Sequence, residues 1–341
     1  MKQKRIGKQT VAFRDPPSIL GSASAVGKKE GEGPLRKSFD VISEDSYFGE
    51  KTWEKAESAM QRLVFQQALN KAKFIPAQLD YLFAGDLLNQ CIASTFAMRD
   101  TSVPYFGLFG ACSTMAEGLG LAAMMIDGGY AEYACALTSS HFCSAERQFR
   151  QPLAYGGQRA PTAQWTATAA GAAVLAGEGD GPYVTHMTTG RIRDAGISDV
   201  NNMGAAMAQA AYDTLRCHFE DLNLSPTDYD LIVTGDLGRI GRGIVLDFFR
   251  RDGVDLSPVY DDCGVLLYDQ TRQDVHAGGS GCGCSAAVLC SWLLDGVRTG
   301  RWRRILFCGT GALMSPTSSG QGESIPGICH AVAISRGRET C

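Results

Sequence analysis

The sequence predicts an α/β protein in which one helix–strand–helix–strand unit occurs twice. Two pairs of segments carry this prediction. The segment 79–90 resembles 229–240, because each has an acidic residue, an apolar run and then Gly-Asp-Leu, so that Asp86 and Asp236 correspond. Further on, 110–140 resembles 281–311, and here Cys112 pairs with Cys284. Alternating helices and strands favour mostly parallel sheets covered by helices.

Each unit begins with an amphipathic helix. The apolar residues of 52–72 recur near helical spacing, and those of 201–222 do the same. Pro76 and Pro226 follow these helices at matching positions, in the loops that lead to the first strand of each unit. On the second helix, we expect His218 at a solvated edge.

The helices that follow Cys112 and Cys284 are apolar on all sides over 116–126 and 285–294. A helix that is hydrophobic all round is buried. We therefore expect both helices in a middle layer between two sheets, with their N-termini facing one shared pocket. A strand-like run follows each helix, at 132–140 and at 303–311.

The repeat divides the chain into an N-terminal half, 1–177, and a C-terminal half, 178–341, joined by a Gly- and Asp-rich turn. The first half carries the loop regions 34–50 and 139–168, and the second carries an insertion around 241–268. No low-complexity linker separates the halves, so we expect one cooperative unit.

Composition narrows the functional classes. Hydrophobic residues make up 45% and charged residues 20%, which is typical of a folded protein, and a net charge of -4 gives no reason to expect nucleic acid as a partner. No apolar run approaches the length of a spanning helix and no signal-peptide core follows the N-terminus, so membrane association is expected to be peripheral. The 12 cysteines are expected to be reduced, and without a CxxC pair no metal site is predicted.

With its duplicated unit and a Gly-x-Cys-Ser motif at the head of the first central helix, the chain resembles proteins of the thiolase fold. That fold includes the ketoacyl synthases. Within that fold, the segments 33–57, 139–179 and 276–289 resemble the stage V sporulation protein AD family, and the resemblance extends from about 11 to 335. It implies two βαβαβ halves in a layered α-β-α-β-α sandwich. It also implies a homodimer.

The resemblance further implies a function. Members bind pyridine-2,6-dicarboxylate (dipicolinate), with calcium accompanying the ligand, and act with membrane proteins of the same complex in its uptake into the developing spore. The expected location is the cytoplasmic side of the forespore or inner spore membrane. Members are not known as condensing enzymes, so no enzymatic activity is expected.

Cys112 leaves three interpretations open. A helix N-terminus favours the thiolate, which suits an acyltransferase nucleophile. Thiolase relatives take a base from two second-half loops, yet here 234–241 and 277–287 contain no histidine. Cys308 resembles the second active cysteine of thiolases, whereas His276 and His330 match no motif position. Cys112 is thus a nucleophile, a structural residue or a residue that lines a binding pocket.

Two helix N-termini aimed at one cavity also form a site for anions. Guanidinium groups on Gly-rich loops would bind the carboxylates, Tyr155 or Trp165 would stack on the pyridine ring, and Asp236 or Asp86 would complete a calcium shell. Arg242 is a further candidate. The predicted ligand site comprises Cys112, Ser113, Arg159, Asp236, Arg239, Cys282, Cys284 and Ser285. A third hypothesis is a scaffold with a vestigial pocket that holds membrane partners.

Overall fold

The computed structural model describes residues 4–149 and 158–338. Its main strands follow the order β12-β11-β14-β15-β10-β3-β9-β7-β5-β6. This order divides into two sets of five, which meet where Tyr183 of β10 pairs with Ser18 of β3. The first sheet contains β3 (Ser18–Gly27), β5 (Tyr81–Gly85), β6 (Tyr105–Leu108), β7 (Tyr133–Ser140) and β9 (Ala169–Ala176). The second contains β10 (Tyr183–Thr188), β11 (Leu231–Thr234), β12 (Tyr260–Asp262), β14 (Arg304–Ala312) and β15 (Gly327–Ser335).

The two sheets repeat each other strand by strand. In the first, β5 runs parallel to β6 and β7, whereas β9 is antiparallel to both β7 and β3. In the second, β11 runs parallel to β12 and β14, whereas β15 is antiparallel to both β14 and β10. The predicted duplication is therefore present in the topology, with one antiparallel strand in each sheet that the sequence comparison did not assign.

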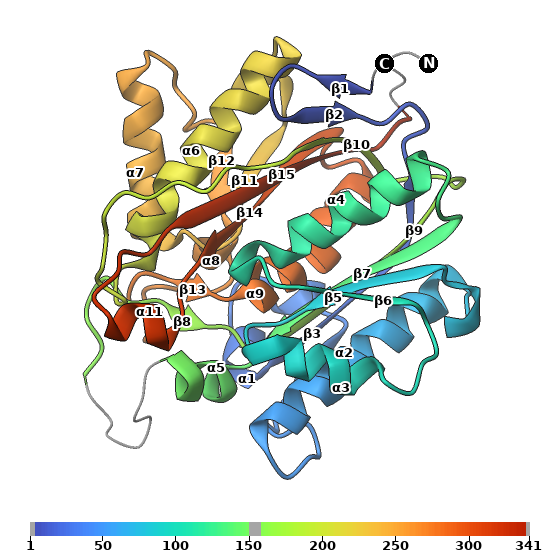
Figure 1. The fold of residues 1–341 in the computed structure, drawn as a ribbon, viewed down its shortest axis with the longest axis horizontal. Helices are drawn as coiled ribbons and strands as arrows, with labels where there is room; N and C mark the ends of the chain where they lie inside the picture. Colours follow the sequence, from blue (N-terminus) through green and yellow to red (C-terminus); the bar gives the residue numbers. More distant parts are fainter. Residues whose placement is uncertain (1–3, 150–157, 339–341) are drawn as a thin grey trace.

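Helices form the outer and middle layers (Figure 1). The outer helices α2 (Trp53–Ala72) and α6 (Met203–Leu222) each cover one sheet, and their apolar faces form separate cores with it. Between the sheets lie α4 (Thr114–Asp127) and the helix formed by α9 (Cys282–Val288), a π-helical turn (Leu289–Leu293) and α10 (Leu294–Thr299). This arrangement is the predicted α-β-α-β-α sandwich.

The remaining elements are short. They are β1 (Arg5–Ile6), β2 (Thr10–Ala12), β4 (Val41–Ser43), β8 (Trp165–Thr166), β13 (Gly279–Ser280), α1 (Lys28–Gly31), α3 (Ile92–Met98), α5 (Phe142–Phe149), α7 (Gly238–Arg251), α8 (Cys263–Leu266) and α11 (Pro316–Gly320). The extra length of the second half lies in α7, which has 14 residues against 7 in α3, and in α8 and the loop up to β13. Among the described residues, no helix combines the length and apolarity needed to cross a membrane.

One prediction about the outer helices is wrong. His218 is fully buried on α6, where its ring nitrogens lie 2.6 Å from the hydroxyl of Thr188 and 2.6 Å from the hydroxyl of Tyr229. Because both nitrogens have partners, the imidazole is satisfied inside the core, and burial lowers its pKa to about 3.

Candidate functional site

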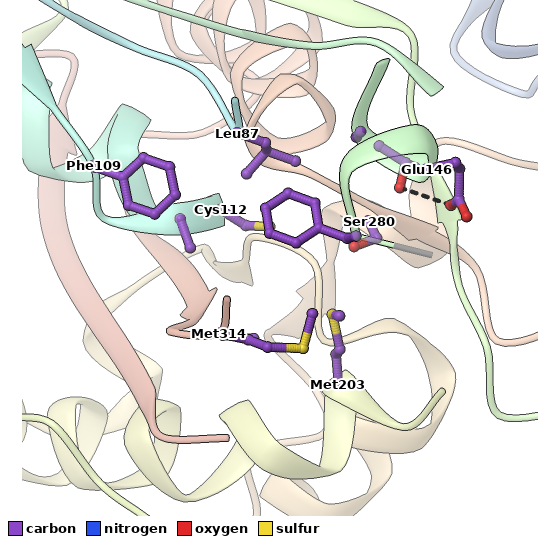
Figure 2. A pocket seen from close by; sticks show the side chains of 12 residues that line it. Leu87, Phe109, Cys112, Glu146, Met203, Ser280 and Met314 are labelled. Atoms are coloured by element: carbon purple, nitrogen blue, oxygen red, sulfur yellow. Dashed lines mark hydrogen bonds between the residues drawn. The ribbon is translucent and has the colours of Figure 1, made fainter. Parts of the chain in front are cut away.

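A pocket opens beside the head of α4 (Figure 2). Just before α4, the turn Ala111–Ser113 places Cys112 at the pocket wall, and Ala111 adopts a left-handed φ of 49° that is unusual for a residue with a side chain. The lining residues come from both halves of the chain. They are Leu87, Phe109, Ala111, Cys112, Ala145, Glu146, Phe149, Thr166, Met203, Ser280, Ala312 and Met314.

The heads of the two middle helices meet next to this pocket. The turn that carries Cys112 packs against the first turn of α9. Between them lies the carboxyl group of Asp236, which follows β11 and is fully buried. The expectation that both helix heads face one place is therefore met, but a carboxyl group of the protein itself already lies there.

Three hydrogen-bond donors of the protein hold this carboxyl group. The Gly281 amide donates to Oδ2 at 2.9 Å, the Ser280 hydroxyl lies 3.3 Å from the same oxygen, and the Thr310 hydroxyl donates to Oδ1 at 2.8 Å. The Cys112 thiol is a fourth polar group beside it. Burial raises the pKa of the Asp236 carboxyl, while these four contacts lower it.

The same surroundings oppose ionisation of the Cys112 thiol. Burial raises the pKa of its thiol well above the ordinary value, and the charges of Asp236 and Cys282 raise it further. The Gly281 amide lowers it, but does not reverse the direction. The predicted thiolate at a helix head is thus opposed by desolvation and by a neighbouring acid, because both disfavour a second negative charge.

Comparison with known proteins decides the family. The sequence model described as "Stage V sporulation protein AD (SpoVAD)" matches residues 7–335. A curated relative, stage V sporulation protein AD of Bacillus subtilis (strain 168), is 43% identical over 333 residues, which cover 98% of each chain. The chain belongs to the stage V sporulation protein AD family.

Solved structures similar to this member of the family share its fold. The 3-oxoacyl-(acyl carrier protein) synthase III of Xanthomonas oryzae pv. oryzae has a TM-score of 0.57 at 17% identity, with 97% of this chain and 100% of that chain covered. Cerulenin-bound OleA of Xanthomonas campestris has a TM-score of 0.58 at 18% identity, with 97% of each chain covered. These likenesses show a thiolase-like fold and carry no conclusion about chemistry.

Several residues predicted to bind ligand in this sporulation family member point elsewhere. The Ser113 hydroxyl donates to the Gly110 carbonyl at 2.7 Å, and the Ser285 hydroxyl donates to the Cys282 carbonyl at 3.3 Å. Both serines are fully buried. Their hydroxyls bond to nearby carbonyls, as serine hydroxyls in a helix turn readily do. Neither lines the pocket.

The other predicted cysteines are buried as well. Cys282 has no exposed surface and its thiol donates to the Ser139 carbonyl at 2.9 Å, whereas Cys284 faces the Gly235 carbonyl at 3.9 Å. Cys308 belongs to the core between the second sheet and α6, and Cys112 belongs to a different cluster. The side chains of the two cysteines that resemble a thiolase pair thus pack in different clusters, although the turn that carries Cys112 contacts β14, the strand of Cys308.

The predicted arginines do not line the Cys112 pocket. Arg159 donates to the Gln164 carbonyl and lies over the Trp165 ring, with its guanidinium carbon 5.0 Å from the ring centroid. Arg239 is exposed at the start of α7, and the Arg242 guanidinium lies 3.2 Å from the Asp261 carboxylate. Their role in ligand binding stays a prediction.

The predicted aromatic residues also lie outside this pocket. Trp165 borders a second hollow of about 1180 Å³, where Phe142 stacks on it at 3.9 Å and the Lys29 ammonium lies 3.4 Å from its centroid. Tyr155 lies outside the described residues. The two remaining histidines near these loops have other partners: His276 lies 3.3 Å from Asp274, and His330 accepts from the Gly190 amide at 3.2 Å.

The predicted calcium ligand of the first half, Asp86, is also held by hydrogen bonds from within the protein. Asp86 accepts hydrogen bonds from the Leu88 amide and from the amide and hydroxyl of Ser94, and it does not line the pocket. Asp236, its second-half equivalent, does not line the pocket either, but it lies behind the lining residue Ser280, 3.3 Å from the hydroxyl of that serine. Of the predicted site residues, the structure thus brings together Cys112, Asp236 and the first turn of α9.

Sequence reasoning missed the walls of the pocket. Ala145, Glu146 and Phe149 come from α5, whereas Met203 and Met314 come from the second half. A strongly amphipathic α5 was the available signal, because one face of it carries Ala145 and Phe149. Nothing in the local sequence shows that Met203, at the start of α6, faces this helix.

Proposed function

We propose that this protein binds dipicolinate in the Cys112 pocket and serves its uptake into the developing spore without changing it chemically. Membership in the stage V sporulation protein AD family supports the ligand. The observation that carries the proposal is the surroundings of Cys112, which is buried in a turn that packs against α9, next to the fully buried carboxyl group of Asp236. A nucleophilic enzyme of this fold needs a base beside the thiol, and none of the described residues that line the pocket is a histidine.

The pocket walls suit a flat ring. Phe109 and Phe149 are aromatic, and Met203 and Met314 are flexible thioethers that pack well against ring edges. Polar atoms are few and converge from Glu146, Thr166 and Ser280, which is the usual composition of a small-molecule site.

We propose that calcium accompanies the ligand. None of the described residues that line the pocket is a lysine or an arginine, whereas the acidic residue Glu146 does line it. In the calcium chelate, the metal balances the two carboxylates of the ligand, so the chelate enters apolar walls at a lower desolvation cost than the free dianion.

Calorimetric titration tests this proposal. We expect heat of binding with calcium dipicolinate, and a weaker response with benzene-1,3-dicarboxylate, which has the same outline but lacks the ring nitrogen. Ala145→Phe, which fills the pocket, should weaken binding at least tenfold. Ala77→Phe, at an exposed position, is the matched control. Absence of binding at millimolar ligand, or equal binding by the two variants, would contradict the proposal.

We also propose a homodimer that forms through β6. This strand is the last of its sheet, and its residues are exposed. An apolar surface surrounds it, formed by Ile92, Phe96, Tyr105, Phe106 and Phe109, which are all 36–49% exposed. An uncharged apolar edge strand pairs readily with another strand, and two copies of one edge are self-complementary.

Finally, we propose that the protein works at the cytoplasmic side of the forespore or inner spore membrane with membrane proteins of the same complex. Family membership supports this location. Fractionation of sporulating cells tests it: the protein should sediment with membranes and should be released when the membrane partners are deleted. Recovery in the soluble fraction of undisturbed cells would contradict it.

A further inference from the structure

The helix α5 forms one wall of the pocket, where Ala145, Glu146 and Phe149 line it (Figure 2). Its opposite side borders a further hollow, which is lined by residues of α5 itself, of α2 and of the segment 88–92. Because a hollow lies on each side, packing fixes the position of α5 less firmly than it fixes a helix embedded in a core. The side chains that join α5 to its neighbours therefore decide where this wall stands.

Two of these links lie near the surface. The Arg147 guanidinium pairs with the Glu54 carboxylate of α2, and both side chains are partly exposed. The Gln148 amide donates to the Leu87 carbonyl at 3.0 Å, and this bond is only partly buried. Exposed pairs contribute little, because water competes for the same groups. Neither link fixes α5 tightly.

The third link is buried. The Ser144 hydroxyl of α5 donates to Oε2 of Glu57 on α2 at 2.7 Å, and each residue is 1% exposed. The other oxygen of Glu57 accepts from the Ser139 hydroxyl at the end of β7, at 2.9 Å, and Ser139 accepts from the Gln61 amide at 2.7 Å. One carboxyl group thus joins α5 to the first sheet and to α2. Without it, two buried hydroxyls would lose this acceptor, which makes the link costly to break.

The fold itself does not require a carboxyl group at this position. The equivalent residue on the other outer helix is Met207, which packs in the core of the second sheet. We infer that Glu57 is a positioning residue of the pocket, which sets through Ser144 how far α5 stands from the first sheet. The wall formed by Ala145 and Phe149 takes its place from that distance. The functional meaning rests on the proposed ligand pocket, whereas the position of α5 is measured without ligand.

Hydrogen exchange of the full-length protein, followed by mass spectrometry without ligand, tests the inference. Ser144→Ala removes the donor to Glu57 and should speed exchange of the α5 amides at least fivefold, while α6 stays unchanged, since local opening controls the rate. The matched control is Ser58→Ala on α2, another buried serine, whose hydroxyl donates to the Ala93 carbonyl at 2.9 Å. Both changes replace a helical serine by alanine, so helix propensity affects them alike. A change at α5 below twofold for Ser144→Ala, or an equal rise for Ser58→Ala, would overturn the inference.

Two changes at Glu57 separate its polar contacts from its bulk. In Glu57→Gln, the amide accepts from Ser139 and donates to Ser144, whose hydroxyl then turns to the His141 carbonyl, 3.1 Å away. This variant should keep exchange of α5 within twofold of the wild type, whereas Glu57→Leu should raise it at least fivefold. Equal exchange in the two variants would contradict a positioning role. If Glu57→Leu does not fold, the comparison of Ser144→Ala with Ser58→Ala still decides.

Calorimetry then connects the position of α5 to the ligand. Binding of calcium dipicolinate should weaken at least fivefold in Ser144→Ala and stay within twofold of the wild type in Ser58→Ala. If the wild type binds no calcium dipicolinate while α5 loosens as expected, the proposed function fails and the positioning role stands. If the wild type binds and Ser144→Ala binds equally well, the positioning role fails.

Discussion

The two halves of the molecule use the same aspartate in different ways. Asp86 and Asp236 follow equivalent strands, but Asp86 accepts from Leu88 and Ser94 within its own half. In the second half, Asp262 at the end of β12 accepts from the amides of Leu237 and Gly238, at 2.8 and 2.9 Å. Asp262 thus accepts from the amides at the start of α7, whereas Asp236 accepts from the Gly281 amide at the head of α9. The duplication gives both halves the same topology. They differ in which aspartate accepts from the amides that follow the first strand, and this difference places Asp236 at the site.

The edge strands differ as well. β6 and β12 end their sheets at equivalent places, yet β6 is exposed and β12 is largely buried. α7 and α8 pack against β12, and they belong to the longer connection of the second half. One edge is thus covered within the chain, and the exposed one is the edge that we propose for the dimer.

The largest expected effect concerns the closest approach between helix and sheet. A side chain on Gly283 would lie 2.1 Å from the Ala169 carbonyl, whereas the equivalent position in the first half holds Ala111. Gly283→Ala should therefore lower the free energy of unfolding by roughly 2–3 kcal/mol, measured by urea denaturation. Gly243→Ala on α7, where a side chain meets nothing within 4 Å, is the matched control and should be neutral or slightly stabilising. Equal losses of unfolding free energy in the two variants would contradict the special role of the glycine at position 283.

The next effect is on assembly. Phe106→Lys places a charge on the exposed β6 edge and should weaken self-association at least tenfold, because a buried lysine must be desolvated. Analytical ultracentrifugation measures the change. Tyr130→Lys, at a residue that is 72% exposed elsewhere, should leave association unaffected. A monomeric wild type, or a dimer that tolerates Phe106→Lys, would contradict pairing through β6.

A smaller expected effect concerns how stability depends on pH, because the buried carboxyl groups of the two halves differ. Burial and the charge of Asp86 raise the pKa of Glu57 to about 8, and the equivalent position on α6 is Met207. Burial raises the pKa of Asp262 to about 7. Folded carboxyls with raised pKa values hold their protons more tightly than unfolded ones, so stability falls as pH rises through these values. Glu57→Gln should flatten the fall, which for this group runs from an unfolded value of about 4.3 up to about 8, seen in urea midpoints. An unchanged slope would place the titration elsewhere.

The smallest expected effect is on covalent chemistry. Incubation of the wild type with acyl-CoA should give no acyl adduct by intact mass, because the Cys112 thiol stays protonated. An adduct that disappears in Cys112→Ser would favour the acyltransferase alternative. If pocket variants leave spore dipicolinate unchanged while the folded protein accumulates, the scaffold hypothesis gains.

The fold could be predicted because both halves keep the residues that mark the ends of their strands and the starts of their helices. Gly-Asp-Leu and Cys-Ser mark strand ends and helix heads in both halves, and apolar periodicity separates outer helices from middle ones. The site was harder to predict. A sequence shows that Ser113 and Ser285 begin helices, but not that their hydroxyls turn to their own carbonyls. Nor does it show that Asp236 fills the space between the helix heads.

The walls of the pocket could not be predicted for a related reason. Phe149, Met203 and Met314 are far apart in the chain and meet through the packing of α5 on the second half. His218 shows the same limit, since a polar residue on an amphipathic helix suggests an exposed edge until Thr188 and Tyr229 are seen beside it.

The most direct test of the account is a structure of the protein crystallised with calcium dipicolinate. The account predicts the ligand in the pocket between Phe149 and Met314, with the Cys112 sulfur unmodified and Asp236 still bonded to the Gly281 amide. A ligand seated in the hollow at Trp165, or bonded covalently to Cys112, would contradict it.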